Sequence, residues 1–110
     1  MSEYRKGYVY IQNRHAGTIA EMDEGYTFSY DVDYLQEEKA VAVSLTMPLR
    51  EKAYRSTILF PFFDGLIPEG WLLHVVGRNW KIDLKDRFGL LLFACQDCIG
   101  DVCIRSEADR

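Results

Sequence analysis

The N-terminal third of the sequence alternates β-prone runs with turn residues, and this pattern limits the chain to folds that begin with an antiparallel sheet. Tyr8–Asn13 (YVYIQN) and Gly17–Met22 (GTIAEM) are rich in strand-forming residues, and Tyr26–Tyr30 (YTFSY) alternates aromatic with small polar side chains. The intervening NRHAG and DEG segments predict turns, and Gly17 is free to adopt a positive φ. We therefore expect a three-stranded meander.

The middle of the sequence predicts a short helical turn and a fourth strand. Asp31–Glu38 predicts one helical turn that begins at Asp31 or Asp33. Ala40–Met47 (AVAVSLTM) predicts a strand that ends at Pro48, because proline cannot donate a hydrogen bond to a sheet. The LREKAYR segment that follows is polar and predicts a loop.

The first of three expected helices runs from Thr57 to about Asp64. Ser56 is suited to be its N-cap, and Gly65 is suited to end it. Pro61 falls inside this helix, where it is acceptable only in the first turn, so the helix alternatively starts nearer Phe60.

The second expected helix begins at Pro68 and reaches about Trp80, and the third runs from about Leu84 to Ala94 with Asp86 or Asp83 near its start. Asp101–Ser106 closes the chain as a strand. Strands that precede helices, with one strand returning, predict an α+β fold. We expect a small antiparallel sheet, made of the N-terminal meander plus later strands, with about three helices packed on one side.

Size and composition predict one domain over residues 1–110. The chain is 48% hydrophobic and 14% aromatic, which is typical of a folded globule with a single modest core. Its net charge of -4 argues against nucleic acid as a direct partner. Glu21–Glu38 holds seven acids and no Lys or Arg, so it is either a solvated edge or a patch that orients a partner.

The N-terminus predicts a cytoplasmic protein. MSEYRKGYVY has charges but no apolar segment of the kind found in signal peptides, and no apolar run is long enough to span a bilayer. Three cysteines without an export signal indicate reduced thiols. We therefore expect no membrane partner.

No complete catalytic or metal site is visible in the sequence. The CQDC motif (Cys95–Cys98) closes a predicted helix, whereas a thioredoxin-like motif opens one. A structural zinc site needs four ligands, and the three cysteines Cys95, Cys98 and Cys103 would supply only three. The fourth would have to be His15 or His74, and both are far away in the sequence and have the wrong spacing. No nucleophile motif and no glycine-rich phosphate loop is present. We expect the cysteines to be packing residues, and the protein to be no enzyme and to bind no cofactor.

Trp71 is the most informative aromatic residue. On a helix from Pro68, one apolar stripe is predicted to face the core, and it comprises Leu72, Val75, Val76 and Trp80. Trp71 lies at the margin of this stripe, close in angle to Arg78. It is either covered by another segment or exposed, and an exposed Trp would be a strong anchor for a partner protein.

Three segments resemble the N-terminal subdomain of HipA-type toxin kinases. They are SLTMPL (Ser44–Leu49), FFDGLIPEGW (Phe62–Trp71) and DRFGLLLFACQDCIGDV (Asp86–Val102). The family reads approximately S-L-S-L-P-L, F-F-x-x-L-L-P-E-x and D-x-F-x-L-L-x-x-x-G-x-D-x-x-G-A-V, in the same order with similar spacing. The chain departs from the family at the glycine of the G-x-D step, which is Cys95 or Gln96 here, and at the alanine of G-A-V, which is Asp101 here.

The resemblance implies an accessory module of a kinase. Full-length HipA proteins carry a Ser/Thr kinase body after this subdomain, and this sequence has no H-x-D catalytic loop or D-F-G motif with a glycine-rich loop. In tripartite HipB–HipS–HipT-like toxin–antitoxin systems, the detached subdomain neutralises the shortened kinase. The implied partners are a HipT- or HipA-like kinase and, in a larger complex, a HipB-like helix-turn-helix protein.

These observations lead to a docking hypothesis. The surface around Gly65–Arg78 is predicted to bind the kinase with Trp71 as its anchor. The alternative is a structural subunit that completes the kinase or supports a DNA-bound repressor complex without inhibition. The expected partner-binding residues are Asp64, Ile67, Glu69, Gly70, Trp71, His74 and Arg78.

Overall fold

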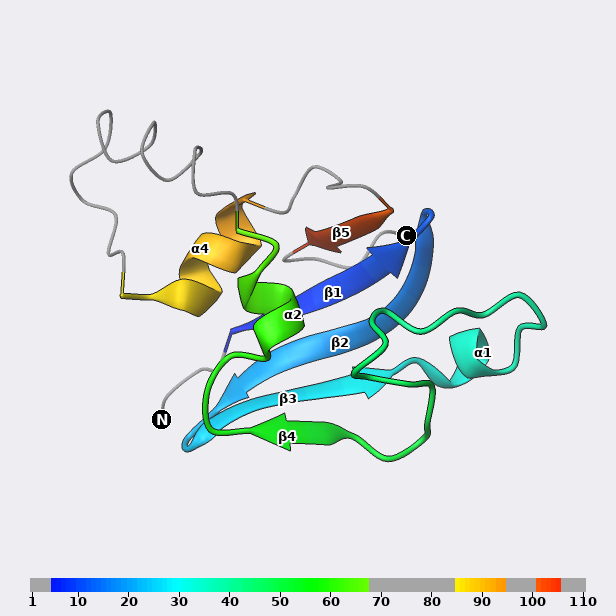
Figure 1. Cartoon of the computed structure of the whole chain (residues 1–110), viewed down its shortest axis with the longest axis horizontal. Coiled ribbons are helices and arrows are strands. Elements are labelled where there is room, and N and C mark those ends of the chain that lie inside the picture. The colour runs from blue at the N-terminus through cyan, green and yellow to red at the C-terminus, as the bar shows by residue number, and fades with distance from the viewer. Residues whose placement is uncertain (1–4, 68–84, 95–100, 106–110) are drawn as a thin grey trace.

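The computed structural model describes residues 5–67, 85–94 and 101–105, which form a five-stranded antiparallel sheet with helices against one face (Figure 1). The sheet order is β4-β3-β2-β1-β5. The strands are β1 (Lys6–Ile11), β2 (Arg14–Met22), β3 (Gly25–Tyr30), β4 (Tyr54–Ser56) and β5 (Val102–Arg105). The described helices are α1 (Val32–Leu35), α2 (Pro61–Asp64) and α4 (Arg87–Ala94). The predicted α+β class, meander and closing strand are confirmed.

The first hairpin turns earlier than predicted. Gln12 and Asn13 take positive φ angles of 51° and 67°, which gives the tight two-residue turn that suits the twist of a hairpin. The predicted turn at NRHAG is therefore wrong, because β2 begins at Arg14. Gly17 lies inside β2 without a positive φ, and a Cβ there would come within 2.5 Å of the Ser29 carbonyl oxygen. Close approach of β3, rather than a turn, requires this glycine.

The predicted fourth strand is also wrong. Ala40–Met47 is irregular apart from one isolated bridge between Ser44 and Met47. The strand that pairs with β3 is β4, in the segment predicted to be a loop, and its register aligns Tyr54 with Phe28. Backbone groups of Val41, Val43 and Met47 are hydrogen-bonded to tyrosine side chains instead of to a neighbouring strand.

Helix α2 begins at Pro61, so the start predicted at Thr57 is wrong and the alternative start near Phe60 is right. Phe60 is extended, with φ of -54° and ψ of 131°. A residue before proline is sterically disfavoured from helical angles, so the chain cannot enter the helix earlier. Gly65 ends the helix as predicted, and its N–H donates to the Pro61 carbonyl at 2.9 Å.

Of the other predicted helices, α1 and α4 lie within the described residues. Asp31 caps α1 as predicted, and Asp86 lies at the start of α4, where its carboxylate accepts from the Gly89 N–H at 3.1 Å. The helix predicted from Pro68 to Trp80 lies outside the described residues. Within the described part, no helix is long and apolar enough to cross a membrane.

Cys103 in β5 is disulfide-bonded, so the expectation that all thiols are reduced is wrong. Within residues 5–67, 85–94 and 101–105, no three His, Cys, Asp or Glu side chains converge as they would around a metal ion.

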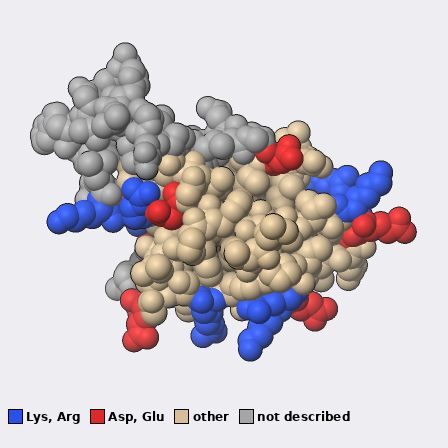
Figure 2. Space-filling view, in the orientation of Figure 1, with Lys and Arg blue, Asp and Glu red and all other residues tan. Residues whose placement is uncertain are grey.

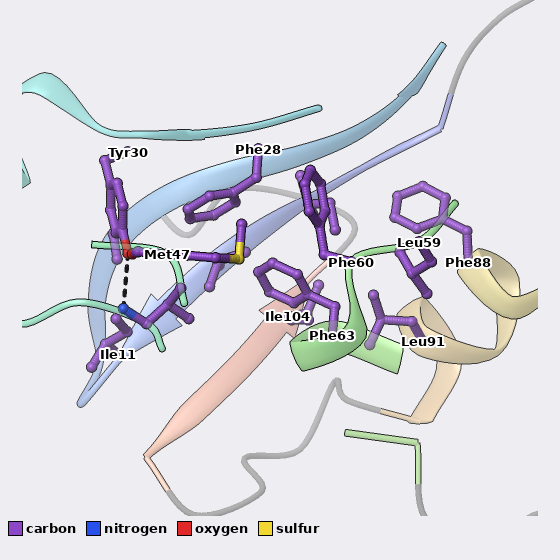
Figure 3. Packing of buried hydrophobic residues seen from close by; sticks show 14 of the residues in the cluster. Ile11, Phe28, Tyr30, Met47, Leu59, Phe60, Phe63, Phe88, Leu91 and Ile104 are labelled. Carbon is purple, nitrogen blue, oxygen red and sulfur yellow. Dashed lines mark hydrogen bonds between the residues drawn. The ribbon is translucent and has the colours of Figure 1, made fainter. Parts of the chain in front are cut away.

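The core lies between the sheet and the layer that contains α2 and α4 (Figure 3). Phe28 of β3 and Phe63 of α2 are both fully buried, and their ring centroids are 5.3 Å apart. Phe88 of α4 is also fully buried and packs against Tyr26 at 5.6 Å. These aromatic contacts hold the two described helices that cover the sheet at fixed positions on it.

Candidate docking surface

One face of the molecule has an uncharged centre. Figure 2 shows Lys, Arg, Asp and Glu around the periphery of this face, whereas the centre, over α2 and the irregular segment after α1, carries other residue types. We call this centre the uncharged face, and we call Ala40–Leu49 the braced loop. An uncharged centre with a charged rim is the arrangement found in protein–protein interfaces.

Tyrosine hydroxyl groups hold the braced loop in place. Tyr30 Oη donates to the Met47 carbonyl and accepts from the Val43 N–H at 2.9 Å. Tyr34 Oη donates to the Val41 carbonyl at 2.9 Å and accepts from the N–H of the same residue at 3.0 Å. Both tyrosines are buried, and burial raises the pKa of Tyr30. The hydroxyls satisfy backbone groups that a sheet would otherwise pair.

The end of the braced loop is held in the same way. Tyr54 Oη donates to the Pro48 carbonyl at 2.5 Å. The Arg50 guanidinium stacks 3.6 Å from the centre of the Tyr54 ring and donates to the carbonyls of Lys52 and Ala53. Both ends of the loop are thus fixed to the sheet through side chains of β3, α1 and β4.

The braced loop buries the side chains of Val43 and Met47 and exposes Leu45 midway between them. Val43 and Met47 are 7% and 4% exposed and belong to the core cluster, whereas Leu45 is 101% exposed. The Met47 N–H donates to the Ser44 carbonyl at 3.1 Å, which closes a turn around Leu45. Val41 is half exposed and Thr46 is exposed as well, so the outward side of the loop carries both apolar and hydroxyl side chains.

Asp64 and Ile67, two of the predicted partner-binding residues, lie at the end of α2. Asp64 Oδ1 accepts from Arg87 Nε of α4 at 2.6 Å, an ion pair that links the two helices. Ile67 is only 4% exposed and is part of the core cluster. Its side chain is therefore not free to contact a partner.

Helix α4 is tied to the sheet by a charged cluster. The Arg5 guanidinium donates to Glu21 Oε1 at 2.9 Å and to Asp86 Oδ1 and Oδ2 at 2.8 Å, and it also lies 5.5 Å from the centre of the Phe88 ring. Its hydrogen bonds hold the pKa of both carboxylates below their usual range. Glu21 is therefore neutralised within the molecule, as is Glu37 by Arg14, so the acidic run Glu21–Glu38 is partly paired.

The remaining predicted site residues are not placed by the structure. They lie outside the described part of the chain and are Glu69, Gly70, Trp71, His74 and Arg78. The structure therefore brings together only Asp64 and Ile67, at the border of the predicted surface.

Sequence reasoning missed the braced loop as a functional candidate. The sequence predicted a strand from Ala40 to Met47, whereas the structure has a turn after Ser44 that leaves Leu45 exposed. The sequence did contain one signal for an irregular segment here. Pro48 follows a short apolar run in S-L-T-M-P-L, and a proline in that position ends a strand and favours a turn.

Comparison with known proteins places the chain in a family. Residues 7–105 match the HipA N-terminal domain family. An uncharacterized protein of Haemophilus influenzae is 35% identical over 103 residues, and the match covers 94% of this chain and 93% of that relative. A solved structure, the N-terminal domain of HipA toxin, is 30% identical, covers 100% of this chain and 99% of that chain, and superposes with a TM-score of 0.75. This chain belongs to the HipA N-terminal domain family.

Proposed function

We propose that this protein is a non-catalytic, antitoxin-like subunit that binds a Ser/Thr kinase of the HipA type and neutralises it. The observation that carries the proposal is the family match, which spans nearly the whole described chain and concerns the N-terminal domain of HipA rather than a catalytic domain. The match to the Haemophilus influenzae protein covers 93% of that relative, which supports a domain that occurs without a kinase body.

The uncharged face supports a binding role. Its centre over α2 and the braced loop resembles the centre of an interface, and the Asp64–Arg87 ion pair lies at its border. In our proposal the segment after Ile67 continues this surface, Trp71 is the main anchor, and Glu69, Gly70, His74 and Arg78 surround it.

The direct test is a search of the neighbouring genes for a short HipA-type kinase and copurification with it, followed by an autophosphorylation assay with and without the purified subunit. We expect a stable complex and loss of kinase activity. A complex that retains full activity would instead favour a structural accessory subunit. No association at all would contradict both roles.

Trp71→Ala tests the anchor. We expect the Kd of the complex to rise by about thirtyfold or more, since truncating a Trp at the centre of an interface commonly costs about 2 kcal/mol or more. Isothermal titration calorimetry gives the Kd, and the autophosphorylation assay shows whether neutralisation is lost in parallel. Unchanged affinity and unchanged neutralisation would rule out Trp71 as the anchor. The matched aromatic control is Phe93→Ala, which truncates a residue of α4 that is 60% exposed.

A further inference from the structure

We draw no further inference here: the strongest candidate, the surface patch at the turn of the braced loop where Val41 and Leu45 are exposed, carries no proposal because nothing in the structure shows what covers it.

Discussion

At the scale of single residues, buried tyrosine hydroxyls decide the course of the backbone. Tyr30 is 5% exposed, and its oxygen bonds to two backbone groups of the braced loop that have no sheet partner. A buried backbone group without a hydrogen bond costs free energy, so this one oxygen atom makes an irregular path after α1 acceptable. Its position on β3 ties the loop to the sheet.

Tyr30→Phe should therefore lower the free energy of unfolding by about 1–3 kcal/mol, because it leaves the Val43 N–H and the Met47 carbonyl without their partner. Urea denaturation followed by circular dichroism measures the loss. Tyr26→Phe is the matched control, since no hydrogen bond of its hydroxyl is present among the described residues, and it should change stability little. Equal losses in the two variants would contradict the role given to the Tyr30 hydroxyl.

At the scale of elements, α4 is held to the sheet by charges as well as by its apolar face. Arg5 precedes β1, Glu21 lies in β2 and Asp86 precedes α4, so one guanidinium joins three parts of the chain. The side chains of Glu21 and Asp86 are 22% and 37% exposed, so solvent screens part of the attraction. The arrangement orients α4, whose Phe88 and Leu91 supply the buried contacts.

This cluster predicts a loss of stability in acid. Folding lowers the pKa of Glu21 and of Asp86, so the folded state binds fewer protons than the unfolded state near the ordinary values of 4.5 and 3.8. The stabilisation is complete above these values and disappears as the pH falls through the lowered ones. We expect the free energy of unfolding to fall between pH 6 and pH 3.

Arg5→Ala removes the cause of both pKa shifts, so the decrease in stability between pH 6 and pH 3 should be smaller in this variant than in the wild type. Urea titrations at both pH values measure the difference. Arg14→Ala, which breaks a more exposed 3.4 Å pair with Glu37, controls for the general loss of a surface cation. An identical acid response in Arg5→Ala and the wild type would contradict the assignment.

At the scale of the whole molecule, the fold is two layers joined by aromatic packing. Phe63 of α2 is fully buried between Phe28 of the sheet and the rings of Phe60 and Phe62. The braced loop contributes Met47 to the same cluster. The uncharged face is the outer side of this layer, so its shape depends on the contact between the layers.

Phe63→Ala should cost about 3–5 kcal/mol, because a large buried side chain leaves a cavity between the layers. This is a large part of the total stability of a domain, which is typically about 5–15 kcal/mol. Thermal and urea unfolding measure the loss. Phe93→Ala, at a residue that is 60% exposed, should cost far less, and a comparable loss there would contradict the two-layer account.

The sequence alone predicted those helices and strands whose forming, capping or ending residues lie within a few positions of each other. The meander followed from period-2 alternation in segments such as Tyr26–Tyr30, the cap of α1 from Asp31, and the end of α2 from Gly65. The family, and with it the α+β fold, was recognisable because three separated segments matched one known order. The docking role of Trp71 and the single domain over residues 1–110 stay predictions.

Only the tertiary structure decided which segment after α1 joined the sheet beside β3. Ala40–Met47 has the stronger strand pattern, yet β4 takes the place beside β3. The reason is that strand pairing is a competition for hydrogen bonds between distant residues. Tyr30 and Tyr34 satisfy the loop from outside its own sequence, and no local pattern contains that information. The exposure of Leu45 follows from the same long-range contacts.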